Sequence, residues 1–151
     1  MKKKQYSIHI NAPVEKVFTV MLGLEDKSTY EAWTALFNPS STFEGSWNKG
    51  GKIYFVGSDE HGNRGGMIAE IEEHIPNKFI SIRPYGILEG TKEIISGEKV
   101  DSWVGGHENY TFSEKDGVTT VLVEIDVVDE YADYFNNTYP NALEKLKEIC
   151  E

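Results

Sequence analysis

One group of residues with the side-chain types to bind a small molecule is built around Arg83. It lies within the run 79–85, and a glutamate such as Glu70 or Glu108 is expected beside it. A guanidinium can hold a ligand carboxylate through two parallel hydrogen bonds if its strand turns that face inward. If the face turns outward, Arg83 is a solvated charge, the commoner situation for arginine. The sequence leaves both orientations open.

A second candidate is the adjacent pair His107 and Glu108. Histidine titrates near neutral pH, and a neighbouring carboxylate raises its pKa, so the pair has the residue types of an acid and a base. Neighbouring residues of a strand point to opposite faces, however. We therefore expect the two side chains not to act together, and we predict no catalytic residues, although an enzyme stays an open alternative.

Metal and cofactor sites are not expected. His9, His61 and His74 show neither the helical i, i+4 spacing nor the short paired spacing of zinc ligands. The single cysteine, Cys150, excludes a multi-cysteine site, and its place on an apolar stripe favours a buried side chain over a nucleophile. The glycine-rich segment 62–66 lacks the strand-glycine-helix context of a dinucleotide fingerprint.

Aromatic residues are numerous, with 3 Trp, 8 Tyr and 7 Phe. Large flat side chains can wall an apolar pocket while a hydroxyl or indole N–H orients the ligand. The alternative is that they only fill the core. The candidate cavity-lining residues, including three polar ones, are Trp33, Phe37, Tyr54, Glu70, Arg83, Tyr85, Trp103, His107, Tyr110, Phe135 and Tyr139.

Length and charge restrict the class of protein. The chain has 151 residues, 39% of them hydrophobic, which predicts one domain over 1–151 with a sizeable core. A net charge of −10 disfavours nucleic acid and anionic membranes as partners. No segment approaches the ~20 apolar residues of a membrane span. The basic start Met1–Lys4 precedes an alternating segment rather than the apolar run of a signal peptide, so we expect a cytoplasmic protein.

The first elements predicted are a strand and two short helices. Tyr6, Ile8 and Ile10 alternate with polar residues, as in a half-buried strand. Apolar residues at helical spacing follow Pro13, and Gly23 is a typical helix terminator, so a helix is expected over 14–22. A second helix is expected over 25–33.

From residue 42 onward the pattern is that of β-strands separated by turns. Residues 87–102 are interrupted by glycines and predict an irregular excursion with a strand extension and a helical turn. In the last strand, Val121, Val123 and Ile125 share one face, so that strand is buried on one side. The expected strands are 42–47, 52–56, 66–74, 79–85, 106–113 and 118–127.

An amphipathic helix ends the sequence. Tyr139, Leu143 and Leu146 fall on one apolar stripe. Pro140 interrupts the pattern, and we expect it to bend the helix or to split it into 130–136 and a segment from Tyr139 onward. A terminal helix after a run of strands must lie across the sheet to bury its stripe, which predicts an α+β fold with an internal hollow.

Several segments resemble START-like domains, also called SRPBCC or birch-pollen-allergen-like domains. The run from Ile10 to Phe18 looks like the opening of such a domain. The segments that resemble the branch related to the C-terminal domain of the activator of the heat-shock protein 90 ATPase are Trp33, Asn38-Pro39-Ser40, Phe43-Glu44-Gly45, Gly50-Gly51 and 139–147.

This resemblance implies a helix-grip fold. In that fold a curved antiparallel sheet of about seven strands wraps around a long C-terminal helix, with two short helices between strands one and two. It also implies a cavity between sheet and helix. It does not specify an activity, because the family includes binding proteins and cyclases.

We expect a module that binds a small apolar or amphipathic ligand, for instance a lipid-like molecule. The first alternative is a cyclase- or hydrolase-type enzyme that uses a polar group in the cavity. The second is a chaperone-interaction module, which rests on the resemblance alone and lacks a counterpart of the activator's additional N-terminal domain.

Overall fold

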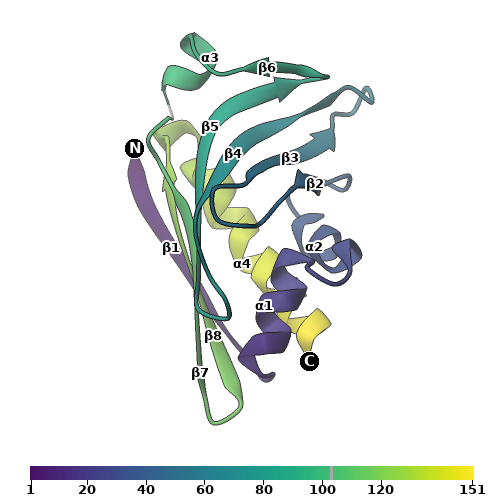
Figure 1. The fold of residues 1–151 in the computed structure, drawn as a ribbon, viewed down its shortest axis with the longest axis vertical. Coiled ribbons are helices and arrows are strands. Elements are labelled where there is room, and N and C mark those ends of the chain that lie inside the picture. The colour runs from purple at the N-terminus through teal and green to yellow at the C-terminus, as the bar shows by residue number, and fades with distance from the viewer. Residues whose placement is uncertain (103) are drawn as a thin grey trace.

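The computed structural model describes residues 1–102 and 104–151. In these residues, eight strands form one antiparallel sheet, and helices cover one of its faces (Figure 1). The predicted α+β architecture is therefore confirmed. The strands follow the order β1-β8-β7-β5-β4-β3-β2, and β6 pairs with β5 outside this path. We call the face that the helices cover the inner face.

The strands lie where the alternation of the sequence predicts them, but some of their bounds differ. Three of them, β3, β4 and β5, extend beyond the predicted ranges, whereas β2 ends at Gly45, two residues early, and β7 runs two residues later than predicted at both ends. The excursion at 87–102 contains the end of β5, the short strand β6 and the single-turn helix α3, as its mixed pattern predicted. The strands are β1 (Lys2–Ile10), β2 (Thr42–Gly45), β3 (Lys52–Ser58), β4 (Arg64–Ile75), β5 (Phe79–Glu89), β6 (Lys92–Ile94), β7 (Glu108–Lys115) and β8 (Val118–Val127).

Each of the two early helices has a local reason for its ends. Helix α1 (Val14–Leu22) starts after Pro13 and ends at Gly23, whose φ of 66° is the left-handed conformation that glycine adopts readily. Helix α2 (Lys27–Thr34) starts two residues later than predicted, because the Asp26 side chain accepts a hydrogen bond from the Ser28 N–H at 3.0 Å and caps it.

The C-terminal helix α4 (Ala132–Cys150) follows the 3₁₀ turn η1 (Asp129–Tyr131) and runs through Pro140 without interruption. Of the two predicted effects of Pro140, a bend or a split, the split into two segments is therefore wrong. Proline removes only one intrahelical donor, and burial of Tyr139, Leu143 and Leu146 on both sides of that position holds the helix against β1, α1 and α2. The short helix α3 (Glu98–Asp101) lies at the far end of the sheet.

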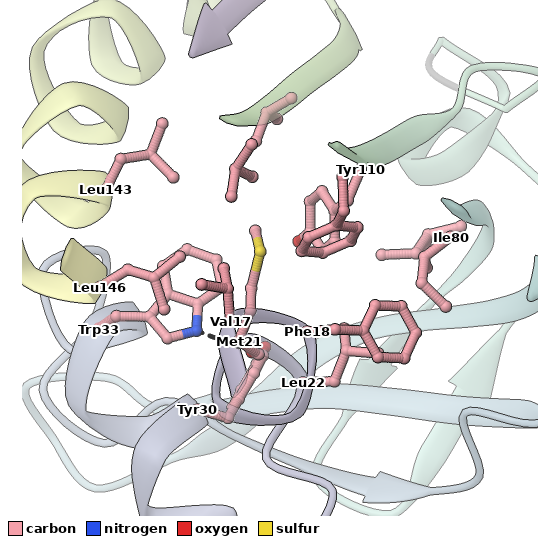
Figure 2. Packing of buried hydrophobic residues seen from close by; sticks show 14 of the residues in the cluster. Val17, Phe18, Met21, Leu22, Tyr30, Trp33, Ile80, Tyr110, Leu143 and Leu146 are labelled. Carbon is pink, nitrogen blue, oxygen red and sulfur yellow. Dashed lines mark hydrogen bonds between the residues drawn. The ribbon is translucent and has the colours of Figure 1, made fainter. Parts of the chain in front are cut away.

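The core lies between the inner face of the sheet and the three helices. Figure 2 shows Phe18, Trp33, Tyr110 and Leu146 converging from α1, α2, β7 and α4. The indole N–H of Trp33 donates to the carbonyl of Met21 at 2.9 Å, so this buried polar group is satisfied. The contact also holds α2 against α1, which positions the side chains of α2 that face the sheet.

Candidate functional site

A cavity of about 380 Å³ lies between α2, the first half of α4 and the inner face of the sheet. This volume falls within the usual range of about 300–1,000 Å³ for small-molecule pockets. The residues that line it are Tyr30, Trp33, Thr34, Phe37, Ser41, Phe55, Met67, Pro84, Gly106, His107, Glu108, Tyr110, Ile125, Asp126, Val127, Val128, Tyr131, Phe135 and Tyr139.

Aromatic rings form the wall on the side of the helices. The Phe37 ring meets the Tyr139 ring edge-on at 5.0 Å between centroids, and Phe135 lies 6.3 Å from each of these two rings. Trp33 contributes from α2, with its ring 6.5 Å from that of Tyr139. Such edge and offset contacts hold the rings in a defined arrangement, so this wall is preformed.

Glu108 brings a carboxyl group into this apolar space. It shares strand parity with the buried residues Tyr110 and Phe112, so its side chain points to the inner face. The Tyr139 hydroxyl donates a hydrogen bond to Glu108 Oε2. Burial raises the pKa of Glu108 above its ordinary value, although hydrogen bonds from Tyr139 and Tyr110 act in the opposite direction.

The tyrosines around Glu108 remain protonated hydroxyls. Burial raises the pKa of both Tyr110 and Tyr139 well above the ordinary value, and the nearby Glu108 charge adds to the effect. Burial and the same carboxylate also raise the pKa of Tyr30. The site therefore combines one carboxyl with hydroxyl groups that can donate hydrogen bonds to it or to a ligand.

The structure brings six of the residues singled out from the sequence to this cavity. They come from α2, the loop after it, the strand β7 with its approach, and α4. They are Trp33, Phe37, His107, Tyr110, Phe135 and Tyr139. Other lining residues were not predicted from the sequence to line the cavity. The most important of these are Glu108 and Tyr30.

Parity with Tyr110 and Phe112 was the signal that could have placed Glu108 inside. The sequence suggested Glu108 only as a partner of Arg83 or as a neighbour of His107. The side chains of His107 and Glu108 do diverge as alternation requires. The His107 ring reaches Glu72 Oε2 at 3.0 Å, whereas Glu108 bonds Tyr139.

Arg83 lies on the outer face of the sheet, so the inward orientation is not realised. Its neighbours Ile82 and Pro84 point to the inner face, and alternation sends Arg83 to the other side. There its guanidinium meets Glu70 at 3.2 Å and Glu72 at 3.4 Å. It also lies over the ring of Tyr85, 5.4 Å from the centroid.

The remaining predicted lining residues are also away from the cavity. Tyr54 and Tyr85 pack on a small outer cluster of Val56, Ile68 and Leu88. Glu70 pairs with Arg83, as described, so both charges are satisfied on the outer face. Trp103 lies outside the described residues.

Other types of site are not found in the part of the chain that the structure describes. No group of three or more histidine, cysteine, aspartate or glutamate side chains there is arranged to hold a metal ion. None of the helices described is long and apolar enough to cross a membrane.

Comparison with known proteins finds likeness in solved structures alone. No family model matches the sequence, and no curated protein matches it either. The chain is similar to the Aha1 dimer from Colwellia psychrerythraea, with 19% identity over 100% of this chain and 97% of that one and a TM-score of 0.68. The chain has the helix-grip fold.

Two further solved structures share this fold. Protein NE0264 from Nitrosomonas europaea is 14% identical, and the match covers 98% of this chain and 93% of that chain with a TM-score of 0.72. DynU16, a protein from the dynemicin biosynthetic locus, matches with 12% identity and a TM-score of 0.65, over 98% of this chain but 46% of its own. At these identities the likeness is one of fold, and function has to be argued from the site.

Proposed function

We propose that this protein binds a small apolar or amphipathic molecule in the cavity between α2, α4 and the sheet. The observation that carries the proposal is a cavity of about 380 Å³ with an aromatic wall and one inward-pointing carboxyl group. Apolar walls with a few convergent polar groups are the general form of ligand pockets. The walls supply affinity, and the group formed by Glu108, Tyr139 and Tyr110 orients the ligand.

Native mass spectrometry of freshly purified protein tests the proposal directly, because a bound ligand adds mass to the intact chain. Titration with the neutral fluorescent probe N-phenyl-1-naphthylamine is the second measurement. We expect saturable binding at one site per chain. The proposal fails if neither a co-purified ligand nor saturable probe binding is found.

A matched pair of variants assigns the binding to the cavity. Met67→Trp adds volume to a lining residue of β4, and we expect it to reduce probe affinity at least tenfold. Ile75→Trp adds the same side chain to the exposed end of β4, where Ile75 is 44% exposed, and should leave the affinity unchanged. Equal affinities for the two variants would show that the probe binds elsewhere.

Acid-base catalysis is a second candidate, favoured by one observation. Glu108 is a carboxyl whose pKa is raised inside a cavity, which is the condition a general acid needs near neutral pH. A cyclase or hydrolase reaction of the captured ligand would then occur. Mass spectrometry over time distinguishes the two: a binding module returns its ligand unchanged, and an enzyme converts it at a rate that falls in Glu108→Gln.

The chaperone-interaction alternative has support only from likeness of fold to Aha1, and none of the cavity's features speaks for it. Failure to capture heat-shock protein 90 with the purified chain would remove it. We therefore place ligand binding first.

A further inference from the structure

Among the described residues, the carboxylates are the charged side chains that line the cavity. Among the described lining residues there is no lysine and no arginine, whereas Glu108 and Asp126 are both present. The whole chain carries a net charge of −10, so its long-range field has the same sign. A negatively charged ligand group would enter this cavity without a counter-ion.

Asp126 and His107, the other titratable lining residues apart from the tyrosines, are occupied by partners. Asp126 accepts a hydrogen bond from the His107 backbone N–H at 2.9 Å and lies 3.5 Å from the Lys3 amine. The His107 ring is held by Glu72. Glu108 is thus the carboxyl that is turned toward the cavity.

Glu108 has hydrogen-bonding capacity left for a ligand. Tyr139 and Tyr110 hydroxyls bond the carboxyl, but an ionised carboxylate offers about four acceptor positions on its two oxygens. Desolvation disfavours the charged form, and none of the described lining residues is a lysine or arginine that would offset it. A cation beside the carboxyl would reverse that preference, because opposite charges attract strongly in an apolar surrounding.

Besides the carboxyl group of Glu108, a buried cation needs aromatic rings around it, and the wall of this cavity supplies them. The rings of Phe37, Phe135 and Trp33 lie 5.0, 6.3 and 6.5 Å from the Tyr139 ring between centroids, and all four residues line the cavity. Ring faces carry partial negative charge and attract ammonium groups within about 6 Å of the centroid. The rings also accept the apolar part of the molecule that carries the charge.

We propose that the ligand of this cavity is a hydrophobic organic amine, whose protonated nitrogen pairs with Glu108 while its apolar part packs on the aromatic wall. The inference rests on the proposed function and specifies its ligand class. Fatty acids and other anionic amphiphiles are disfavoured by the same arrangement, since their head group would be buried beside Glu108 without a cation. The carboxyl receives a positive partner, and the amine loses little of its hydrogen bonding.

Three probes that differ only in the head group test this inference: 4-phenylbutylamine, 4-phenylbutanol and 4-phenylbutanoate at pH 7. Each is titrated into the wild-type protein by calorimetry and by displacement of N-phenyl-1-naphthylamine. We expect the amine to bind at least tenfold more tightly than the alcohol, and the carboxylate to bind most weakly. Equal affinities, or a carboxylate that binds as tightly as the amine, would overturn the inference.

Variants of two carboxylates locate the preference. Glu108→Gln keeps the side-chain shape and removes the charge, so the advantage of the amine over the alcohol should disappear while the neutral probe still binds. Glu70→Gln removes a carboxylate of the outer face that pairs with Arg83, and should keep the advantage. If Glu108→Gln retains the preference for the amine, Glu108 is not its partner. If this variant does not fold, Glu108→Asp and the wild-type ranking still decide.

The outcome for the neutral probe separates the two proposals. If the neutral probe does not bind to the wild-type protein, the proposed function itself fails. If it binds but the amine does not displace it better than the alcohol does, the cavity binds ligands and only the amine inference is wrong.

Discussion

The hydroxyl of Tyr139 donates a hydrogen bond to Glu108, and this contact joins the middle of α4 to the first residue of β7. Tyr139 is 1% exposed and its ring also contacts Phe37 and stacks on Tyr6 at 5.1 Å. One side chain thereby packs the helix on the sheet and places a donor in the cavity. The stability of the fold and the polarity of the site therefore depend on the same residue.

Replacing Tyr139 with phenylalanine should keep the packing and remove the donor. Because a buried carboxyl then loses a partner, we expect the free energy of unfolding to fall by about 1–3 kcal/mol. Urea denaturation measures it. The control is Tyr134→Phe, whose hydroxyl bonds the Phe37 carbonyl at 3.0 Å from a side chain that is 45% exposed, with an expected change within about 0.5 kcal/mol. Similar losses in both variants would contradict the special role of Tyr139.

Glu108 should make stability depend on pH in a defined direction. Its pKa is raised in the folded state by burial, so the folded protein binds this proton more tightly than the unfolded chain does. The stabilisation is complete below the unfolded pKa of about 4.3 and is lost as pH rises through the folded pKa. We expect Glu108→Gln to gain stability relative to wild type as pH increases above about 4. A difference that stays constant in urea denaturation from acid to neutral pH would contradict this.

Cys150 should be unreactive in the folded protein. Its side chain is buried, and burial raises the pKa of the thiol to about 11. The reactive thiolate is therefore scarce at pH 8, and we expect alkylation by iodoacetamide to be roughly a hundredfold slower than in the unfolded chain. Mass spectrometry follows the single adduct, since the sequence has one cysteine. Equal rates with and without denaturant would show that the end of α4 is open.

Two adjacent glycines of β4 should respond differently to alanine. A Cβ at Gly66 would lie 2.1 Å from the Phe55 carbonyl oxygen of the neighbouring strand, whereas one at Gly65 would lie 3.4 Å from the Leu88 carbonyl. We expect Gly66→Ala to cost about 1–3 kcal/mol, because the backbone of β3 must move. Gly65→Ala should be neutral or slightly stabilising. Thermal unfolding of the two variants measures the difference, and an equal loss of stability in both would contradict the prediction.

Pro140→Ala should stabilise α4. A proline inside a helix lacks the N–H that would bond the carbonyl four residues earlier, at Asn136, and costs up to about 3 kcal/mol relative to alanine. Because Tyr139 directly precedes this position, Phe135 lies five residues earlier on the same helix, and both line the cavity, we also expect a change in neutral-probe affinity. Asn141→Ala, on an exposed side chain of the same helix, is the control and should change neither quantity appreciably. A Pro140→Ala variant without added stability would show that the helix is already relaxed.

Local patterns predicted the elements well. The alternation along β8 places Val121, Val123 and Ile125 in the core, and Gly23 ends α1 in the left-handed conformation. These features depend on neighbours within a few residues, which is the range that periodicity and glycine signals report. Pro140 shows the limit of such reasoning, since tertiary packing on both sides keeps the helix continuous.

The candidate site was predictable only in part. Alternation shows which residues of a strand share a face, but it does not show whether that face is the inner or the outer face of the sheet. Ile82 and Pro84 decide that Arg83 points outward, and Tyr110 and Phe112 decide that Glu108 points inward. Trp33 and Tyr139 were expected near a cavity from their elements, but their distance to each other depends on how α2 and α4 cross.

The sequence by itself determined the class of fold, the order of its elements and the apolar stripe on the terminal helix, since each follows from short-range periodicity and turn chemistry. Tertiary structure alone decided which charged residues face the cavity and that Tyr139 meets Glu108, 31 residues earlier in the chain. The physical reason is that sheet curvature and helix crossing bring distant segments together, and a shift of one residue in strand parity exchanges the inner and outer faces.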